Sequence, residues 1–257
     1  MTSATALRPV SGSARAVYEA LRGWWSHPDR PIVVRTSGST GSPKDVLLSH
    51  AALSAATHAT ASRLDGHGQW LLDLPPDRAG GLMVLVRTIA AGISPVLASD
   101  HGSFAAAVGA LSWPRCFTAL VPTQLHRLAM SGELGLLTRF DAVLVGGASL
   151  RPDLLRRCAD EGVRVVRTYG LTETCGGCVY DGYPLDDVGV RLGAEGRIEL
   201  GGPMLFDGYA GDPGLTTRVL RDGWLVTDDL GRLDDDGRLH VLRRVCLLYT
   251  SPSPRDS

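Results

Sequence analysis

Residues 36–44, which read TSGSTGSPK, have the composition of a phosphate-binding loop. Glycine lets the backbone adopt positive φ and approach a ligand closely, hydroxyl groups donate to phosphate oxygens, and a lysine adds positive charge. A solvated Ser/Gly linker has a similar composition, but this stretch lies between two apolar runs, PIVVR and DVLLS, which favours a binding loop. The candidate phosphate ligands are Thr36, Ser37, Gly38, Ser39, Thr40, Gly41 and Lys44.

The loop does not match the Walker pattern of P-loop nucleotidases, in which lysine directly follows glycine and a helix begins at once. Here Pro43 precedes Lys44 and Asp45 follows it. Residues 46–48 predict a strand, and Ser49 is the predicted N-cap of the next helix. The sequence therefore predicts a strand, loop, strand arrangement, in which amides, hydroxyls and the lysine hold the anion without a helix dipole.

The bulk composition is that of a globular chain long enough for one large α/β domain or two smaller ones. It has 257 residues, 44% of them hydrophobic, and a formal net charge of -1 from 26 basic and 27 acidic residues. This balance predicts no general affinity for nucleic acid or for anionic membranes. No apolar run approaches the ~20 residues of a transmembrane helix, and the N-terminus lacks the apolar region of a signal peptide, so we expect a cytoplasmic protein.

The five cysteines, an odd number spread along the chain, argue against a disulfide framework. Cys175 and Cys178 form a C-x-x-C pair, but neither Cys116 nor Cys158 has a Cys or His at metal-binding spacing to complete a zinc site. A thioredoxin-like redox pair would begin a helix, whereas CGGCVYD runs into an apparent strand. We therefore expect the glycines of this segment to form a tight turn near an active site.

Apolar runs alternate with helical stretches over residues 1–186, a pattern typical of a parallel or mixed sheet layered with helices. Ligand sites in such sheets lie beyond the carboxyl ends of the strands. Two predicted strands, 142–145 and 163–167, are followed by mostly small residues that we expect to line one crevice. The other predicted strands are 32–35, 46–48, 70–72, 94–97 and 117–120, and the predicted helices are 13–25, 49–64, 80–91, 103–111, 123–130 and 152–161.

From residue 187 the chain changes to short strands separated by glycine and aspartate, which predicts a small β-rich subdomain over residues 187–245. Residues 234–237 carry a hairpin signal. The final residues, 246–257, read CLLYTSPSPRDS and fit neither texture. They resemble read-through from a cloning or sequencing adaptor, and we expect them not to be native sequence.

Three segments occur in the order and rough spacing of motifs in the adenylate-forming superfamily, the acyl-CoA synthetases and their relatives. They are TSGSTGSPK, TYGLTET at 168–174 and GWLVTDDLGRL at 223–233. Within that superfamily the stretch YGLTETCGGCVYDGYPLDDV, together with the short N-terminal region, resembles actinobacterial o-succinylbenzoate-CoA ligases of menaquinone biosynthesis. The resemblance covers roughly residues 31–244.

This resemblance implies a two-step reaction in which a small-molecule carboxylate attacks the α-phosphate of ATP, pyrophosphate leaves, and the thiol of coenzyme A then displaces AMP. Such chemistry needs preorganised donors and a magnesium ion around the polyphosphate. By resemblance, residues 36–44 hold the β and γ phosphates, Thr172 donates to the α-phosphate, and Glu173 helps to hold Mg²⁺. A solvated loop acid is the alternative interpretation of Glu173.

The resemblance also implies an adenosine site. Asp229 matches the aspartate of the family's T-G-D motif, which accepts hydrogen bonds from the ribose, although the motif reads Thr227, Asp228, Asp229 here. Arg244 matches the arginine of the hinge motif G-R-x-D and is expected to contact ribose or phosphate. Small residues give room for adenine, and a tyrosine ring gives a face on which adenine can stack. The alternative interpretation of Tyr169 is a core residue with no ligand contact. The implied adenine slot comprises Gly146, Gly147, Ala148, Tyr169 and Gly170.

Two further departures concern the acid and the hinge. Arg78 stands where many relatives place a histidine or aromatic residue that shapes the acyl pocket, so it either pairs with a carboxylate of a dicarboxylic substrate or faces solvent. The hinge motif loses its aspartate after Arg244, and Lys44 is the only lysine in the sequence. In relatives a C-terminal domain supplies a lysine for adenylation. We therefore expect this polypeptide to bind ATP weakly and to adenylate very slowly, and pyrophosphate exchange at a normal rate with o-succinylbenzoate would contradict that expectation.

Three alternatives remain open from the sequence. The acid could be a fatty or another aryl carboxylate, or the thiol could belong to a carrier protein. The chain could also be a non-catalytic nucleotide-binding fragment. A kinase or other Walker-type nucleotidase is disfavoured because the G-K-[ST] sequence is absent.

Overall fold

The computed structural model describes residues 9–36 and 43–245, and a seven-stranded mixed sheet forms the centre of this part of the chain. Five strands, in the order β4-β3-β5-β6-β7, run parallel; β8 then pairs antiparallel with β7, and β9 pairs antiparallel with β8. This is the mixed α/β architecture predicted from the alternating pattern. The strands are β3 (Gln69–Leu72), β4 (Val96–Leu97), β5 (Cys116–Leu120), β6 (Ala142–Val145), β7 (Val165–Leu171), β8 (Gly176–Tyr180) and β9 (Tyr183–Pro184).

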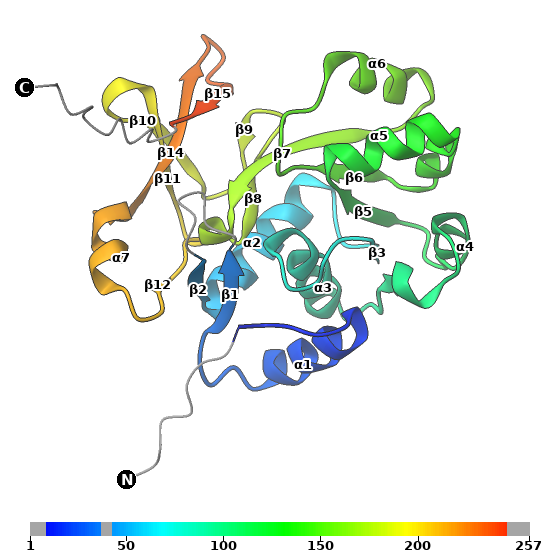
Figure 1. Cartoon of the computed structure of the whole chain (residues 1–257), viewed down its shortest axis with the longest axis horizontal. Helices are drawn as coiled ribbons and strands as arrows, with labels where there is room; N and C mark the ends of the chain where they lie inside the picture. The colour runs from blue at the N-terminus through cyan, green and yellow to red at the C-terminus, as the bar shows by residue number, and fades with distance from the viewer. Residues whose placement is uncertain (1–8, 37–42, 246–257) are drawn as a thin grey trace, which may run out of the picture.

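Helices cover both faces of this sheet, as Figure 1 shows. Successive strand residues point to opposite faces, so Trp70 and Leu72 pack on the side of α2 and α3, whereas Leu71 packs on the side of α4, α5 and α6. Two hydrophobic cores result, one on each face. The helices are α1 (Ala14–Ser26), α2 (His50–Arg63), α3 (Ala79–Ala91), α4 (Phe104–Gly109), α5 (Pro122–Ser131), α6 (Pro152–Asp160) and α7 (Pro213–Val219), with 3-10 turns η1 (Ala98–Asp100), η2 (Leu134–Arg139), η3 (Thr172–Thr174) and η4 (Ala194–Gly196).

A separate three-stranded sheet carries the two ends of the candidate phosphate loop. Antiparallel strands β1 (Ile32–Thr36) and β2 (Lys44–Leu48) pair so that Thr36 lies opposite Lys44. The side chain of Ser49 accepts a hydrogen bond from the amide of Ala52 at the start of α2. The two strands predicted on either side of residues 37–42 and the predicted N-cap are confirmed.

The chain beyond residue 187 forms a five-stranded antiparallel sheet and also completes the three-stranded one. Strand β12 (Gly208–Tyr209) pairs with β2, so the sheet that flanks the loop contains residues from both ends of the chain. The other strands are β10 (Gly189–Leu192), β11 (Arg197–Gly201), β13 (Leu220–Arg221), β14 (Trp224–Leu233) and β15 (Leu239–Arg244), and β14 and β15 form the hairpin predicted at 234–237.

One predicted strand end was wrong. The sequence indicated that the strand over 163–167 would stop at Arg167, but β7 continues to Leu171. The extension follows from pairing, because β7 lies parallel to β6 over its first half and antiparallel to β8 over its second half. Thr168, Tyr169 and Gly170 therefore line their crevice from a strand rather than from a loop.

Candidate active site

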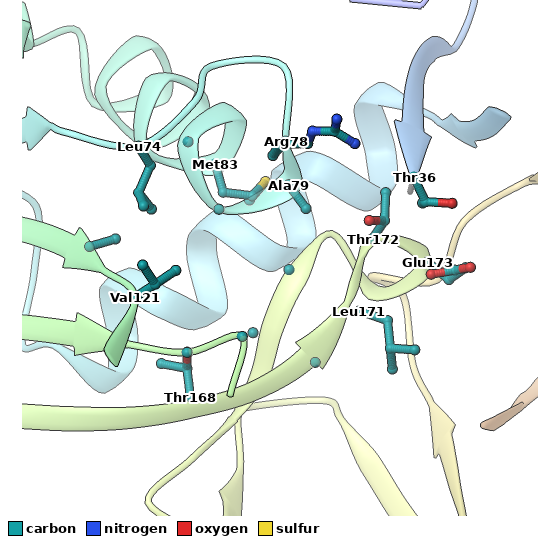
Figure 2. Close-up of a pocket in the computed structure, with 18 of the residues that line it drawn as sticks. Thr36, Leu74, Arg78, Ala79, Met83, Val121, Thr168, Leu171, Thr172 and Glu173 are labelled. Carbon is teal, nitrogen blue, oxygen red and sulfur yellow. The ribbon is translucent and has the colours of Figure 1, made fainter. Parts of the chain in front are cut away.

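A cavity of about 680 Å³ opens beyond the carboxyl ends of β5 and β6, where the predicted crevice lies. This volume lies in the range of sites for small molecules. Figure 2 shows polar Thr36, Arg78, Thr172 and Glu173 toward one end and apolar Leu74, Met83 and Val121 toward the other. The cavity can therefore hold a ligand with one charged and one apolar part.

The polar end brings together residues that the sequence places far apart. Thr36, Lys44, Thr172 and Glu173 all line it. The buried Glu173 accepts a hydrogen bond of 2.7 Å from the hydroxyl of Tyr209, and the Nζ of Lys44 lies 5.4 Å from the centre of the same ring. Tyr209 thus links the predicted lysine and carboxylate, although the sequence gave no signal for it.

The turn that carries Thr172 and Glu173 is fixed by Thr174. The Oγ1 of Thr174 accepts from the amide of Leu171 and lies within hydrogen-bond distance of the carbonyls of Leu171 and Gly176. Cys175 then adopts a left-handed φ of 51° and leads into β8. A tight turn is present beside the C-x-x-C pair, but the prediction that its glycines form it was wrong: the turn is Thr172–Thr174 with Cys175, and Gly176 and Gly177 begin β8 because they pair with β7.

The remaining predicted phosphate ligands, Ser37, Gly38, Ser39, Thr40 and Gly41, lie outside the described residues. Their predicted role therefore stays a prediction. The two strands that flank them place Thr36 and Lys44 at the polar end of the cavity.

A second cavity of about 590 Å³ is lined by Ala148, Tyr169 and Asp229. It shares Gly147, Thr168, Gly170 and Arg244 with the first cavity, so the two spaces adjoin. The implied adenine slot is thereby divided, since Gly146 lines only the first cavity, and Ala148, which is exposed, lines only the second. A nucleotide could span both spaces across their shared wall.

Asp229 lines the second cavity and accepts three side-chain hydrogen bonds. It is 5% exposed, accepts 3.0 Å from the hydroxyl of Tyr169, and accepts from Arg244 through Nε at 2.8 Å and Nη2 at 3.3 Å. Its neighbour Asp228 is exposed and pairs with Arg197 at 3.2 Å. The two adjacent aspartates therefore point into different surroundings, and Asp229 is the one enclosed by predicted nucleotide ligands.

Burial and these carboxylates shift the titration of their partners. Burial, reinforced by Asp229, raises the pKa of Tyr169 well above its ordinary value. Burial and Glu173 do the same for the pKa of Tyr209. The hydrogen bond to Asp229 raises the pKa of Arg244. Both tyrosines are therefore neutral hydrogen-bond donors at neutral pH.

Two glycines of the implied adenine slot have a packing reason to be glycine. A Cβ on Gly146 would lie 2.4 Å from Oγ1 of Thr168, and a Cβ on Gly170 would lie 2.0 Å from the carbonyl oxygen of Gly176. The residue after β6 therefore lies against the Thr168 side chain of β7, and β7 approaches the backbone of β8 too closely for a side chain at position 170.

Arg87 is a site residue that the sequence analysis missed. It lines the first cavity, is 5% exposed, and its guanidinium lies 4.9 Å from the centre of the Trp70 ring. Within residues 9–36 and 43–245, no carboxylate pairs with it, and its Nε has no hydrogen-bond partner. A buried charge without a counterion is costly, so such a group points to an anionic ligand. An arginine in the otherwise apolar stretch AGGLMVLVRTIAA was the signal that could have revealed it.

Arg78, the predicted substrate ligand, lies at the rim of the same cavity. It is exposed, and its Nη1 donates to the carbonyl of Arg35 at 3.1 Å. Besides Arg244, which both cavities share, the first cavity therefore contains an exposed arginine, Arg78, and a buried one, Arg87.

Metal-binding clusters and membrane spans were also sought in the described part of the chain. No group of three or more His, Cys, Asp and Glu side chains there could hold a metal ion. Among the described helices, none is both long enough and apolar enough to cross a bilayer. Cys175 and Cys178 are buried free thiols, and burial raises the pKa of both, that of Cys178 to about 12.

Known proteins similar to this chain include ligases and synthetases that act on succinylbenzoate by name. A probable 2-succinylbenzoate–CoA ligase of Mycobacterium tuberculosis is 43% identical over 93% of this chain, which spans 64% of that relative's length. The solved o-succinylbenzoate CoA synthetase of Bacillus subtilis in complex with its acyl-adenylate intermediate matches with a TM-score of 0.74 and 26% identity, over 83% of this chain and 49% of that one. The same synthetase in complex with ATP and magnesium ion matches with a TM-score of 0.72 and 26% identity, over 83% and 50%.

A family model, which describes a whole group of enzymes rather than one relative, also matches most of the chain. The model for AMP-binding enzymes aligns with residues 21–204, which include β5, β6, β7 and the turn carrying Thr172 and Glu173. The chain therefore belongs to the AMP-binding enzyme family.

Proposed function

We propose that the chain carries the nucleotide- and acid-binding region of an ATP-dependent acid–thiol ligase that converts 2-succinylbenzoate into its coenzyme A thioester, a step of menaquinone biosynthesis. In the first step a carboxylate oxygen attacks the α-phosphorus of ATP and pyrophosphate leaves. In the second step the thiol of coenzyme A attacks the acyl carbon of the adenylate and AMP leaves. We further propose that the protein acts in the cytoplasm, where both co-substrates are available.

The unpaired, buried guanidinium of Arg87 is the observation that carries the substrate assignment. Its cavity is otherwise lined by apolar side chains at that end, including Leu74 and Met83. 2-Succinylbenzoate combines an aromatic ring with two carboxylates, so one carboxylate can pair with Arg87 while the other reaches the polar end. A monocarboxylic fatty or aryl acid would leave Arg87 without a counterion.

ATP fits the two adjoining cavities with its adenosine in the second. There Tyr169 offers a ring face and Asp229 offers acceptors for the ribose hydroxyls. Crossing the shared wall places the phosphates near Thr172 and Lys44, and toward residues 37–42. Arg244, which lines both cavities, then lies between ribose and α-phosphate.

Glu173 suits a magnesium ion that arrives with the nucleotide. Tyr209 donates to its Oε1, and its carboxylate lines the polar end of the cavity. Magnesium prefers oxygen ligands and commonly takes one or two carboxylates together with substrate phosphates. When bound, the ion would offset negative charge on the polyphosphate.

Calorimetric titration of the chain with 2-succinylbenzoate, in the presence of magnesium and a non-hydrolysable ATP analogue, tests the assignment. We expect Arg87→Met to weaken binding by about tenfold or more, because a charged partner is lost. Arg78→Met tests the rim arginine in the same way. The control ligand is 4-oxo-4-phenylbutyrate, which lacks the ring carboxylate. If the unmodified chain binds this monocarboxylate as tightly as the dicarboxylate, the proposed substrate is wrong.

A further inference from the structure

The surroundings of Arg87 contain a chain of hydroxyl groups that the nucleotide and acid sites do not explain. Nη2 of Arg87 lies 3.4 Å from the hydroxyl of Tyr180, and that hydroxyl lies 3.2 Å from Oγ1 of Thr60. Oγ1 of Thr60 in turn lies 2.9 Å from the carbonyl of Ala56. The four groups come from α2, α3 and β8; Arg87 and Tyr180 line the first cavity, and Thr60 and Ala56 lie behind them.

The donor and acceptor of each hydrogen bond in this series of hydroxyl groups can be assigned from the two ends of the series. The carbonyl of Ala56 only accepts, so Thr60 donates to it, and Thr60 must then accept from the hydroxyl of Tyr180. Arg87 only donates, so the remaining lone pair of Tyr180 accepts from its guanidinium. Both hydroxyls therefore have one fixed orientation, and all the hydrogen bonds run in one direction, from Arg87 to the carbonyl of Ala56.

All the side chains in this series of hydrogen bonds are buried. Tyr180 is 1% exposed, Thr60 is 2% exposed and Arg87 is 5% exposed. Trp70, which contacts the guanidinium from its ring face, is 3% exposed. At this depth a hydrogen bond is electrostatically stronger than in water, and a carboxylate partner would cancel the charge that a ligand needs.

We infer that Tyr180 and Thr60 are positioning residues for acid recognition: their hydroxyl relay orients the guanidinium of Arg87 without neutralising it. The inference rests on the proposed function, because it assumes that Arg87 meets a substrate carboxylate. Neutral acceptors fix the direction of the guanidinium, while its full charge stays available to the anion. Thr60 lines neither cavity, so it acts only through Tyr180, whereas Tyr180 lines the first cavity beside Arg87.

The test compares the affinities of 2-succinylbenzoate and 4-oxo-4-phenylbutyrate, because general damage weakens both and lost positioning changes their ratio. We expect Tyr180→Phe to reduce the preference for the dicarboxylate by about threefold to tenfold. Thr60→Val should do the same, whereas Thr60→Ser retains the hydroxyl and should restore the preference. If Tyr180→Phe does not fold, the pair of Thr60 variants decides the question.

Thr57 provides a matched control on the same helix. It is 1% exposed, and its hydroxyl donates to the carbonyl of Leu53 at 2.8 Å, within its own helix. Thr57→Val should therefore leave the preference unchanged. If it lowers the preference as much as Thr60→Val does, the effect comes from α2 and not from the relay, and the inference is wrong.

A ligand-free measurement separates failure of the relay from failure of the proposed substrate. The side-chain ¹⁵N resonance of Arg87, assigned by its loss in Arg87→Lys, should show a guanidinium with restricted rotation that becomes freer in Tyr180→Phe. An unchanged resonance overturns the relay, whatever the substrate. A changed resonance in a chain that does not prefer 2-succinylbenzoate supports the relay and overturns the substrate.

Discussion

Asp228 and Asp229 illustrate how far one residue's surroundings decide its role. Both are carboxylates in the segment that resembles the ribose-binding motif, and the alignment of that motif was the sequence argument for Asp229. The structure buries Asp229 against Tyr169 and Arg244 and leaves Asp228 at the surface. Since β-strand residues alternate between faces, adjacent aspartates in β14 cannot share one environment.

Substitution of each aspartate by asparagine should therefore give unequal results. Asp229→Asn removes the charge that Arg244 and Tyr169 contact, and we expect it to weaken AMP binding about tenfold and to lower the free energy of unfolding by ~1–3 kcal/mol. Asp228→Asn removes an exposed ion pair, and we expect a change in stability below ~1 kcal/mol. Calorimetry with AMP and urea denaturation measure both. Equal effects of the two substitutions would contradict the assignment of the ribose ligand.

Asp73 gives a pH-dependent prediction at the same scale. Burial raises its pKa above 3.8, although Arg127 and a hydrogen bond from Gln124 act in the opposite direction. The native state therefore holds this proton more tightly than the unfolded state, and the group lowers stability as pH rises above its unfolded pKa. We expect Asp73→Asn to equal or exceed the unmodified chain in free energy of unfolding at pH 7, with the difference shrinking toward pH 4. Urea denaturation across this range measures it, and a constant deficit of the variant at every pH would contradict it.

Several site residues could be predicted because they belong to contiguous segments. The seven residues 168–174 contain Tyr169, Gly170, Thr172 and Glu173. Strand β7 and the turn after it bring these residues to the cavities together. Tyr180 and Arg87 could not be paired in this way. Their contact joins residues 93 positions apart, and only the packing of β8 against α3 creates it.

At the scale of elements, β12 has an effect larger than its two residues. By pairing with β2 it adds Tyr209 beside Lys44 and under the turn that carries Glu173. The sequence placed these residues in a separate β-rich region, because strand pairing between distant segments leaves no local pattern. The polar end of the first cavity therefore depends on contacts between the beginning and the end of the described chain.

Tyr209→Phe tests this link. The substitution keeps the ring under Lys44 but leaves the buried carboxylate of Glu173 without its hydrogen-bond donor, which should cost ~1–3 kcal/mol of unfolding free energy. We also expect the affinity for magnesium–ATP to fall. Tyr183→Phe is the matched control, because Tyr183 is 42% exposed and should lose little. A stability loss no larger than that of the control would show that the link is unimportant.

At the scale of the whole molecule, the central sheet separates two hydrophobic cores, and the cysteines report on both. Cys116 and Cys158 lie in the core with α4, α5 and α6, whereas Cys175 and Cys178 lie in the core with α2 and α3. All four are free and buried, and burial raises the pKa of each thiol. Their modification therefore requires opening of the fold rather than local exposure.

We expect iodoacetamide to label these four thiols at least about a hundredfold more slowly in the native chain than in urea, because the thiolate is the reactive form. Cys246 lies outside the described residues, so the experiment uses Cys246→Ser. Mass spectrometry of the labelled peptides gives a rate for each core. Rapid labelling of Cys175 or Cys178 alone would contradict burial of the turn after β7.

The alternation of strands and helices made the layered fold predictable, because apolar runs and small residues mark strands and their carboxyl ends. The close packing at Gly146 and Gly170 was not predictable, because no pattern distinguishes a glycine that packing requires from one that contacts a ligand.

The position of Lys44 over Tyr209 also bears on whether a reactive intermediate could modify the protein itself. Acyl adenylates readily acylate amines, and Lys44 carries the only side-chain amine in the sequence. The remaining basic side chains of the Lys and Arg set are arginines, whose guanidinium groups stay protonated and are poor nucleophiles. If the proposed reaction is correct, an adenylate that forms in the cavity can acylate only one lysine amine of this sequence, and that amine lies at the phosphate end of the same cavity.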